Sequence, residues 1–502
     1  MNQKFRLGSL SVLLSLLGGG LLISPAQAVD APPAVEQDTG LDILLTQKAR
    51  DILERVRLVD GQARSRRVEV SADIANGVVT VALDRDFVPA DYGPSFEDQR
   101  SEISFGLLHW AEQVAPFSRV VFLYDGKEIE YYFPEIKAAD DAARKAGDAL
   151  RRMRGTPGSG MAFVAAGHGY FYSYKDNRWV TSRDEWNGVS EGLLTPSYAA
   201  ELKAMIEQRS QMPVVRPRVQ ITGTTHPPSG EEWWTIAARY AIAEQYPAET
   251  KIWNTYAGST LWDREEREDI NSRPLLANHH GAEVAIHLHS NGEPSGAARG
   301  TRVIVQPGRP MDAALAQSVL CSMKELIHSV PEYADFSVAP APHAENKGEN
   351  REAKMPSIIV ETAFHTNPDD AKALQDPVFR SAAMKGVEKG YRLWAQGKAC
   401  EPLTLHPLPD VEVPLQAVRE LTVGFAGNPQ YPLELEVAVA DCDRPGYCTP
   451  WKGRFEDPDA PVKFEVSCSS TEPGSVRWNV LLRDADDVVA APVAFTQSCV
   501  RA

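Results

Sequence analysis

The chain has 502 residues, of which 68 are acidic and 52 basic, and its formal net charge at pH 7 is −16. An acidic balance of this size disfavours nucleic acids and anionic surfaces as partners. The length allows about three domains of ~150 residues each, so more than one hydrophobic core is expected.

The first 28 residues have the pattern of an export signal. Lys4 and Arg6 precede an apolar stretch, and Ala26-Gln27-Ala28 is a small-x-small cleavage site. Removal of this segment takes away two positive charges and changes the net charge from −16 to −18. No later segment is apolar for long enough to cross a bilayer. The sequence therefore predicts a periplasmic or secreted protein with no membrane insertion of the mature chain.

An acidic, proline-containing linker is expected over residues 29–40, and a small α+β domain over residues 41–135. The domain begins with a helical pattern over 41–58 and continues with a hairpin around Asn76-Gly77, the residues that a tight primed turn needs. A second hairpin is predicted at Asp125-Gly126. This order of elements resembles the GerM-type domain, and no catalytic constellation is present in it. Binding or positioning is the expected role.

Residues 136–159 form a predicted charged helix and a glycine-rich linker, after which strand and helix patterns alternate up to residue 400. Strands separated by amphipathic helices predict an α/β domain with a mainly parallel sheet, covered by helices on both faces. The strand segments are MAFVAA, VVRPRVQIT, EVAIHLH, TRVIVQ and SIIVETA, and the helices are expected over 197–211, 231–245, 261–271, 312–329 and 369–395.

Short alternating strands, prolines and cysteines characterise residues 405–502, which predicts a β-sandwich-like domain. All six cysteines lie at or beyond Cys321, and exported proteins commonly pair their cysteines. Cys321 and Cys400 are the expected pair of the α/β domain. The other four are expected to pair among themselves in the terminal domain: Cys442, Cys448, Cys468 and Cys499.

Three predicted strands of the α/β domain end in side chains that can carry chemistry, namely His168, His289 and Glu361. Open α/β sheets bind ligands at the carboxyl ends of their strands. Alternation places His287 on the same face as His289, so the alternation alone leaves either as a ligand. Glu191, which precedes a predicted helix, is a further candidate.

Two histidines and a carboxylate on separate elements suit a catalytic zinc ion, which keeps one position for water. A second carboxylate is then needed to move protons, and Glu361 is suited to that role. Competing chemistries are disfavoured because the sequence has no GxSxG, HExxH or phosphate loop. A nucleophilic cysteine is disfavoured as well, since Cys321 and Cys400 are not at strand ends.

Four ordered motifs resemble the zinc-dependent N-acetylmuramoyl-L-alanine amidases with a type-3 amidase domain. They are GHG at 167–169, NGVSE at 187–191, LHSN at 288–291 and PSIIVETAFHTN at 356–367, and an R-x-x-x-x-N pattern begins at Arg273. The resemblance covers about residues 160–397. The chain departs from the family after the first histidine, where Tyr170-Phe171 replaces Asp-Pro, and residues 222–260 have the character of an insertion.

The resemblance implies that His168, Glu191 and His289 hold zinc and that Glu361 is the general acid/base. It also implies the substrate, the amide bond between N-acetylmuramic acid and L-alanine in peptidoglycan. Position favours His289 over His287, because ~3.3 Å per residue puts His287 roughly 6–7 Å deeper in the sheet. Two alternatives are a zinc peptidase acting within the stem peptide and a non-catalytic wall-binding protein.

Overall fold

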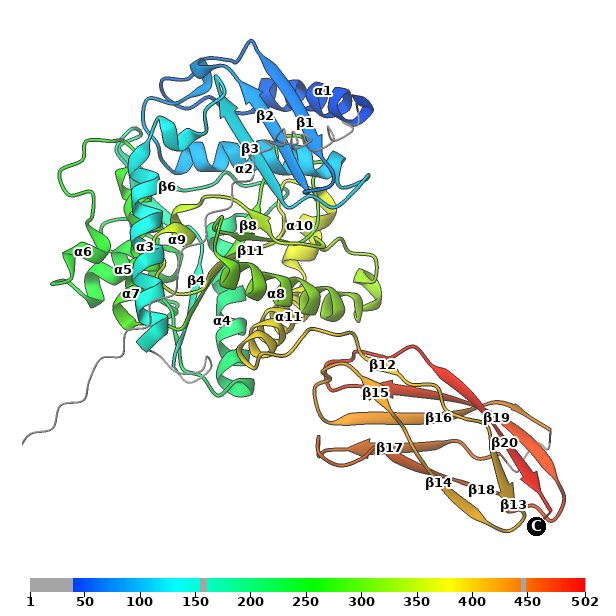
Figure 1. The fold of residues 1–502 in the computed structure, drawn as a ribbon. Coiled ribbons are helices and arrows are strands. Elements are labelled where there is room, and N and C mark those ends of the chain that lie inside the picture. The colour runs from blue at the N-terminus through cyan, green and yellow to red at the C-terminus, as the bar shows by residue number, and fades with distance from the viewer. Residues whose placement is uncertain (1–38, 154–159, 444–447, 502) are drawn as a thin grey trace, which may run out of the picture. The chain divides into compact units, whose positions relative to one another are not determined.

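The structure, a computed structural model, describes residues 39–153, 160–443 and 448–501 (Figure 1). The predicted export signal and nearly all of the predicted linker lie outside the described residues. Within the described part, no helix combines the length and apolar character needed to span a membrane. The described residues cluster as one unit.

The N-terminal region is a three-stranded sheet, in the order β1-β2-β3, that packs against two helices. Strands β1 and β2 pair antiparallel across Asn76-Gly77, which confirms the first predicted hairpin. Strands β2 and β3 are parallel, because α2 connects them as a crossover. The elements are α1 (Thr39–Arg55), β1 (Val68–Asp73), β2 (Val78–Leu83), α2 (Pro94–Ala111) and β3 (Arg119–Tyr124).

The second predicted hairpin is wrong. After β3 the chain turns at Asp125 and Gly126, both with positive φ, and Tyr124 and Lys127 form a single bridge. The chain then enters a 3-10 turn that buries Ile129, so the alternating pattern of this segment does not form a strand. Helix α3 (Pro134–Met153) follows. Helix α2 begins with a proline in its first turn, where the missing N–H costs no hydrogen bond.

The central sheet has six strands in the order β10-β9-β11-β8-β4-β7. Neighbours from β11 to β7 are parallel and β9 is antiparallel to β11, so the predicted mainly parallel sheet is confirmed. The segment VVRPRVQIT contributes only the two residues of β7, since Pro217 has no N–H for a ladder. The strands are β4 (Ala162–Ala166), β7 (Val214–Val215), β8 (Val284–Asn291), β9 (Arg302–Val305), β10 (His343–Ala344) and β11 (Ser357–Phe364). The hairpin β5 (Tyr170–Ser173) and β6 (Arg178–Thr181) stands apart from this sheet.

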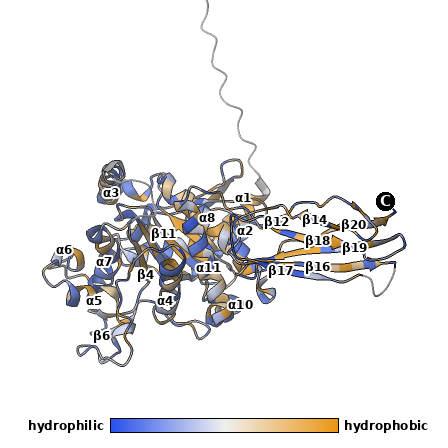
Figure 2. Ribbon diagram, turned by 90° about the horizontal axis from the view of Figure 1, so that it is seen from below, coloured by the Kyte–Doolittle hydropathy of each residue, from blue (hydrophilic) through white to orange (hydrophobic). Residues whose placement is uncertain are grey.

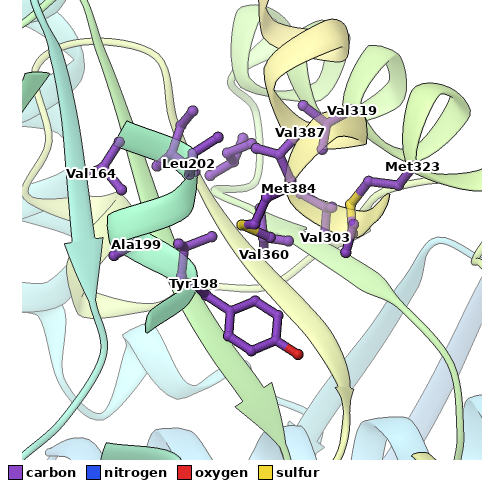
Figure 3. Packing of buried hydrophobic residues seen from close by; sticks show 14 of the residues in the cluster. Val164, Tyr198, Ala199, Leu202, Val303, Val319, Met323, Val360, Met384 and Val387 are labelled. Carbon is purple, nitrogen blue, oxygen red and sulfur yellow. The ribbon is translucent and has the colours of Figure 1, made fainter. Parts of the chain in front are cut away.

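One face of the central sheet is covered by three long helices (Figure 1). Val164, Val303 and Val360 point from the strands into a cluster that includes Leu202 of α4 and Met384 of α11 (Figure 3). All of these side chains are buried, which makes this the main hydrophobic core of the central region. The helices of the central region are α4 (Glu191–Arg209), α5 (Ala238–Gln245), α6 (Thr250–Trp253), α7 (Arg264–His280), α8 (Pro310–His328), α9 (Gly348–Arg351), α10 (Pro368–Gln375) and α11 (Pro377–Ala395).

The other face is covered partly by α5 and α7 and partly by the N-terminal region. Ile304, Ile359 and Phe364 of the central sheet belong to the same hydrophobic core as the N-terminal sheet. The ring of Phe105 on α2 lies edge-on to Phe364, with 5.8 Å between the ring centroids. A bidentate ion pair between Arg302 and Glu112, at 2.8 and 2.7 Å, lies beside this core. The N-terminal region therefore covers the part of this face that the helices of the central region leave open.

The C-terminal region is β-rich, as predicted, with hydrophobic residues marked in orange along its strands (Figure 2). A five-stranded sheet, β13-β20-β19-β16-β17, and a β14-β18 pair enclose a separate hydrophobic core. The strands are β12 (Thr404–Leu405), β13 (Val411–Pro414), β14 (Val418–Thr422), β15 (Phe425–Ala426), β16 (Leu433–Cys442), β17 (Trp451–Phe455), β18 (Lys463–Ser467), β19 (Gly474–Arg483) and β20 (Val493–Val500).

The predicted cysteine pairing is confirmed. Cys321 on α8 is bonded to Cys400, after α11. The four remaining cysteines pair within the C-terminal region, as Cys442–Cys448 and Cys468–Cys499.

Candidate metal centre

Three buried side chains from different elements bring potential metal-ligand atoms together. His168 follows β4, Glu191 begins α4 and His289 lies near the end of β8. Glu191 Oε1 is 3.0 Å from His289 Nδ1, and Glu191 Oε2 is 3.6 Å from His168 Nε2. One ligand atom from each residue lies within 4.8 Å of the others. Two imidazoles and one carboxylate at this spacing form a donor set suited to a single metal ion.

The backbone at His168 has a conformation that its neighbours must permit. His168 itself has φ 58°, in the left-handed region, and Gly169 has φ 132°. A Cβ at Gly167 would collide with the His289 ring, and one at Gly169 would lie 2.7 Å from the Ala237 nitrogen. The two glycines therefore let the strand turn sharply and bring the His168 imidazole close to His289.

Glu361 lies beside this group because β8 and β11 are parallel neighbours, with Glu361 paired in register with His289. Its side chain is 8% exposed, and its Oε2 has no hydrogen-bond partner among the described residues. Burial, reinforced by the nearby carboxylate of Glu191, raises the pKa of Glu361 to about 8. A carboxyl group with a pKa near neutrality can take up and release a proton at physiological pH.

His289 lies between two carboxylates. Its Nδ1 faces Glu191, and its Nε2 is 3.0 Å from Glu349 Oε2. Burial lowers the pKa of His289, but the charges of Glu349 and Glu191 outweigh burial and raise it to about 10. Burial and the positive charge of Arg183 hold the pKa of His168 well below its usual range. The carboxylates around His289 thus favour a positive charge at this point, which a metal cation would supply.

His287 is not part of this group. It is fully buried one β-strand repeat deeper than His289, and both of its ring nitrogens lack a hydrogen-bond partner among the described residues. Its Nδ1 is 3.6 Å from Glu349 Oε1. Burial lowers the pKa of His287 to about 4, so it is neutral at physiological pH.

The group opens into a cavity of about 700 Å³ that the N-terminal region helps to form. His168, Glu191, His289 and Glu361 line its floor with Glu349 and His365. The N-terminal region contributes another part of the wall, with Arg55, Arg57, Glu97, Asp98 and Glu102. The cavity is therefore shared between two regions that are distant in sequence.

Sequence reasoning brought forward all four residues of the group, but it missed two cavity residues with polar roles. Glu349 lies on the four-residue helix α9, which is too short to show a periodic pattern. His365 Nδ1 is 3.0 Å from the hydroxyl of Ser290. This histidine lies within the motif at 356–367, but the motif assigned it no role. The only available signal for His365 was its place four residues after Glu361, just beyond a strand end.

Comparison with known proteins gives one family match: residues 163–392 match the family described as N-acetylmuramoyl-L-alanine amidase. No curated protein matches the chain.

Similar solved structures include the catalytic domain of CwlV, an N-acetylmuramoyl-L-alanine amidase from Bacillus (Paenibacillus) polymyxa var. colistinus. It is 16% identical over 46% of this chain and 95% of that chain, with a TM-score of 0.31. The CwlD amidase from Clostridioides difficile, solved in complex with the GerS lipoprotein, is 16% identical over 48% of this chain and 100% of that chain, with a TM-score of 0.33. The N-acetylmuramoyl-L-alanine amidase AmiC2 of Nostoc punctiforme is 15% identical over 48% of this chain and 99% of that chain, with a TM-score of 0.32.

Proposed function

We propose, given that residues 163–392 form a domain of the N-acetylmuramoyl-L-alanine amidase family, that this chain hydrolyses the amide between N-acetylmuramic acid and L-alanine in peptidoglycan. The observation that carries the proposal is the buried group of His168, Glu191 and His289 beside the unpaired oxygen of Glu361. The first three residues are the proposed zinc ligands, and Glu361 is the proposed general acid/base.

Zinc is the metal that this donor set fits best, since it accepts imidazole nitrogen and carboxylate oxygen in a site with three protein ligands. A zinc ion held there would supply a Lewis acid for the scissile carbonyl and lower the pKa of a water to about 7. His168 offers Nε2, the ring nitrogen that lies 3.6 Å from Glu191 Oε2. Burial keeps this imidazole neutral, as metal binding requires. His289 offers Nδ1, and the first residue of α4, Glu191, offers its carboxylate.

Glu361 is the proton carrier in this proposal. As the carboxylate it accepts a proton from the attacking water, and as the acid it donates that proton to the nitrogen of the departing L-alanine. Both roles use one buried carboxyl group whose pKa is raised to about 8, which allows it to exchange a proton near neutral pH. Proton transfer of this kind typically contributes about 10²–10⁴-fold to the rate.

The wider organisation is part of the same proposal. We assign residues 1–28 to an export signal, 29–40 to a linker, 41–135 to a small N-terminal domain, 136–159 to a helix and linker, 160–400 to the catalytic domain and 405–502 to a C-terminal domain. Three disulfides agree with an oxidising compartment, so we place the mature protein in the periplasm or outside the cell.

Product analysis tests the reaction. The purified protein, incubated with peptidoglycan fragments, should release peptides with a free amino terminus at L-alanine and leave glycan with an intact lactyl group, as mass spectrometry can establish. Glu361→Gln should lower turnover by about 10²–10⁴-fold while zinc content stays unchanged. Cleavage within the stem peptide would instead identify a peptidase, and intact fragments would favour a wall-binding protein.

Metal analysis tests the ligand set. The wild-type protein should contain about one zinc per chain, because three protein ligands hold one ion. His289→Ala should lose zinc and activity together, whereas His287→Ala should keep most of its zinc. Zinc retained in the first variant and lost in the second would contradict the assignment of His289.

A further inference from the structure

The side of His289 that faces away from Glu191 is occupied by a buried, charged assembly. Glu349 Oε2 lies 3.0 Å from His289 Nε2, and Glu349 Oε1 lies 2.9 Å from an Nη2 of Arg273. Glu349 is 4% exposed and Arg273 is fully buried. Glu349 is therefore held between a cation on α7 and the proposed zinc ligand on β8.

An imidazole can use one nitrogen for a metal while the other carries a proton. If Nδ1 of His289, which faces Glu191, binds the metal, the N–H is at Nε2 and donates to Glu349 Oε2 at 3.0 Å. A carboxylate in this position fixes the tautomer and the ring orientation of a metal-binding histidine, and it makes the other nitrogen a better donor. Arg273 forms an ion pair with the second oxygen of Glu349, and this attraction favours the orientation in which the other oxygen faces His289.

The short helix that carries Glu349 depends on the N-terminal region. Helix α9 has only four residues, far fewer than an isolated helix needs for stability. Glu97 of α2 accepts a hydrogen bond from the Gly348 N–H at 3.0 Å and another from Arg351 Nη1 at 2.9 Å. Lys347, just before the helix, donates to Asp98 of α2 at 3.1 Å. Helix α2 thus holds α9 at its beginning and near its end.

We propose that Glu349 is a positioning residue that sets the tautomer and orientation of His289 for zinc, and that Glu97 of the N-terminal region supports zinc binding by holding the helix that carries Glu349. The inference rests on the proposed zinc site and extends it. It assigns the N-terminal region a role in metal affinity, although it contributes no metal ligand.

The test is zinc affinity, measured by competition with a chelator of known affinity for the full chain. Glu349→Gln should weaken zinc binding by about 10–100-fold, the usual effect of removing a carboxylate that supports a metal-binding histidine. Glu97→Gln should weaken it in the same direction by less. Glu352→Gln is the matched control, because Glu352 caps the same helix and, among the described residues, its carboxylate has one ion pair, with Arg351 at 3.6 Å, so the zinc affinity of this variant should equal that of the wild type.

Two further measurements separate positioning from general structural support. The metal-free Glu349→Gln protein should remain folded, with a lower melting temperature because the buried Arg273 loses an ionic partner, and its cobalt(II)-loaded form should have a shifted visible absorption spectrum. If Glu349→Gln does not fold, Glu97→Gln gives the same test, with weaker zinc binding in a metal-free protein that circular dichroism shows to be folded.

Wild-type zinc affinity in a folded Glu349→Gln protein would overturn the role of Glu349, and wild-type affinity in Glu97→Gln would overturn the role of the N-terminal region. A wild-type cobalt spectrum together with a much lower melting temperature would mark Glu349 as a structural residue only and would also overturn the proposal. Failure of the wild-type protein to bind zinc would instead overturn the proposed zinc site itself.

Discussion

The N-terminal and C-terminal regions are attached to the catalytic region in different ways. The N-terminal region shares a hydrophobic core with the central sheet through Ile304, Ile359 and Phe364. The C-terminal strands have a core of their own, and among the described residues Leu326 is the buried side chain of the catalytic region that belongs to it. Their contact with the helices is largely polar, with Arg209 bound to Asp486 through two hydrogen bonds of 2.7 and 2.8 Å.

This difference indicates that the site depends on the N-terminal region and not on the C-terminal region. Segments that share a core unfold together, whereas segments with separate cores and a polar contact can unfold independently. The N-terminal region covers the sheet face that carries Glu361 and His289, and it lines the cavity beside them. None of the described cavity-lining residues comes from the C-terminal strands.

The largest expected difference between the two regions is in what happens to folding and turnover when each is deleted. A chain that lacks residues 39–133 should fail to accumulate as folded protein, since the deletion exposes the apolar side chains of Ile304, Ile359 and Phe364 and leaves the buried Arg302 without Glu112. A chain that lacks residues 405–502 keeps the Cys321–Cys400 disulfide and should retain its fold and turnover. Circular dichroism and product analysis measure both. An active chain without the N-terminal region would refute the comparison.

A single substitution in each core gives a smaller effect. Phe105→Ala should lower the free energy of unfolding by about 3–5 kcal/mol and should also lower turnover, because this core supports the catalytic face of the sheet. Phe464→Ala, in the C-terminal core, removes an equally buried ring and should cost a similar amount in its own region. Turnover of that variant should stay at the wild-type value. Urea unfolding followed at both regions, with parallel rate measurements, distinguishes the two; equal losses of turnover would count against separate cores.

The smallest expected effect is a pH dependence of stability that comes from His289 and Glu361, in the cavity. The folded-state pKa values of His289, about 10, and Glu361, about 8, lie above the unfolded values of 6.5 and 4.5. The folded state therefore binds more protons, and stability falls as the pH rises through these folded-state values. The melting temperature of the metal-free protein should fall between pH 7.5 and 10.

The chain without residues 405–502 should show the same fall, and Glu361→Gln should remove its lower part, up to about pH 8. Saturating zinc should flatten the curve, because metal binding needs neutral His289. A melting temperature of the metal-free wild type that is constant or rises over this range would show that these groups do not control stability.

Much of the fold followed from local patterns. The buried runs around Val164, Ile286 and Ile359 predicted parallel strands, because only a sheet covered on both faces keeps such runs out of water. The helix predicted over 369–395 is divided into α10 and α11, and α11 begins at Pro377 because proline fits the first turn of a helix. The prediction of the second hairpin was wrong because Ile129 is buried in a 3-10 turn instead of a strand. That burial depends on tertiary packing, which the local pattern does not show.

The sequence by itself determined which residues could carry the chemistry, because strand ends, flanking glycines and ordered motifs are local features. It pointed to His168, Glu191, His289 and Glu361 in this way. Only the tertiary structure decided that Glu349, 60 residues along the chain from His289, reaches its other ring nitrogen, and that Glu97 in the N-terminal region holds the helix of Glu349. The physical reason is that these contacts depend on the packing of α2 against the central sheet, which no short stretch of sequence encodes.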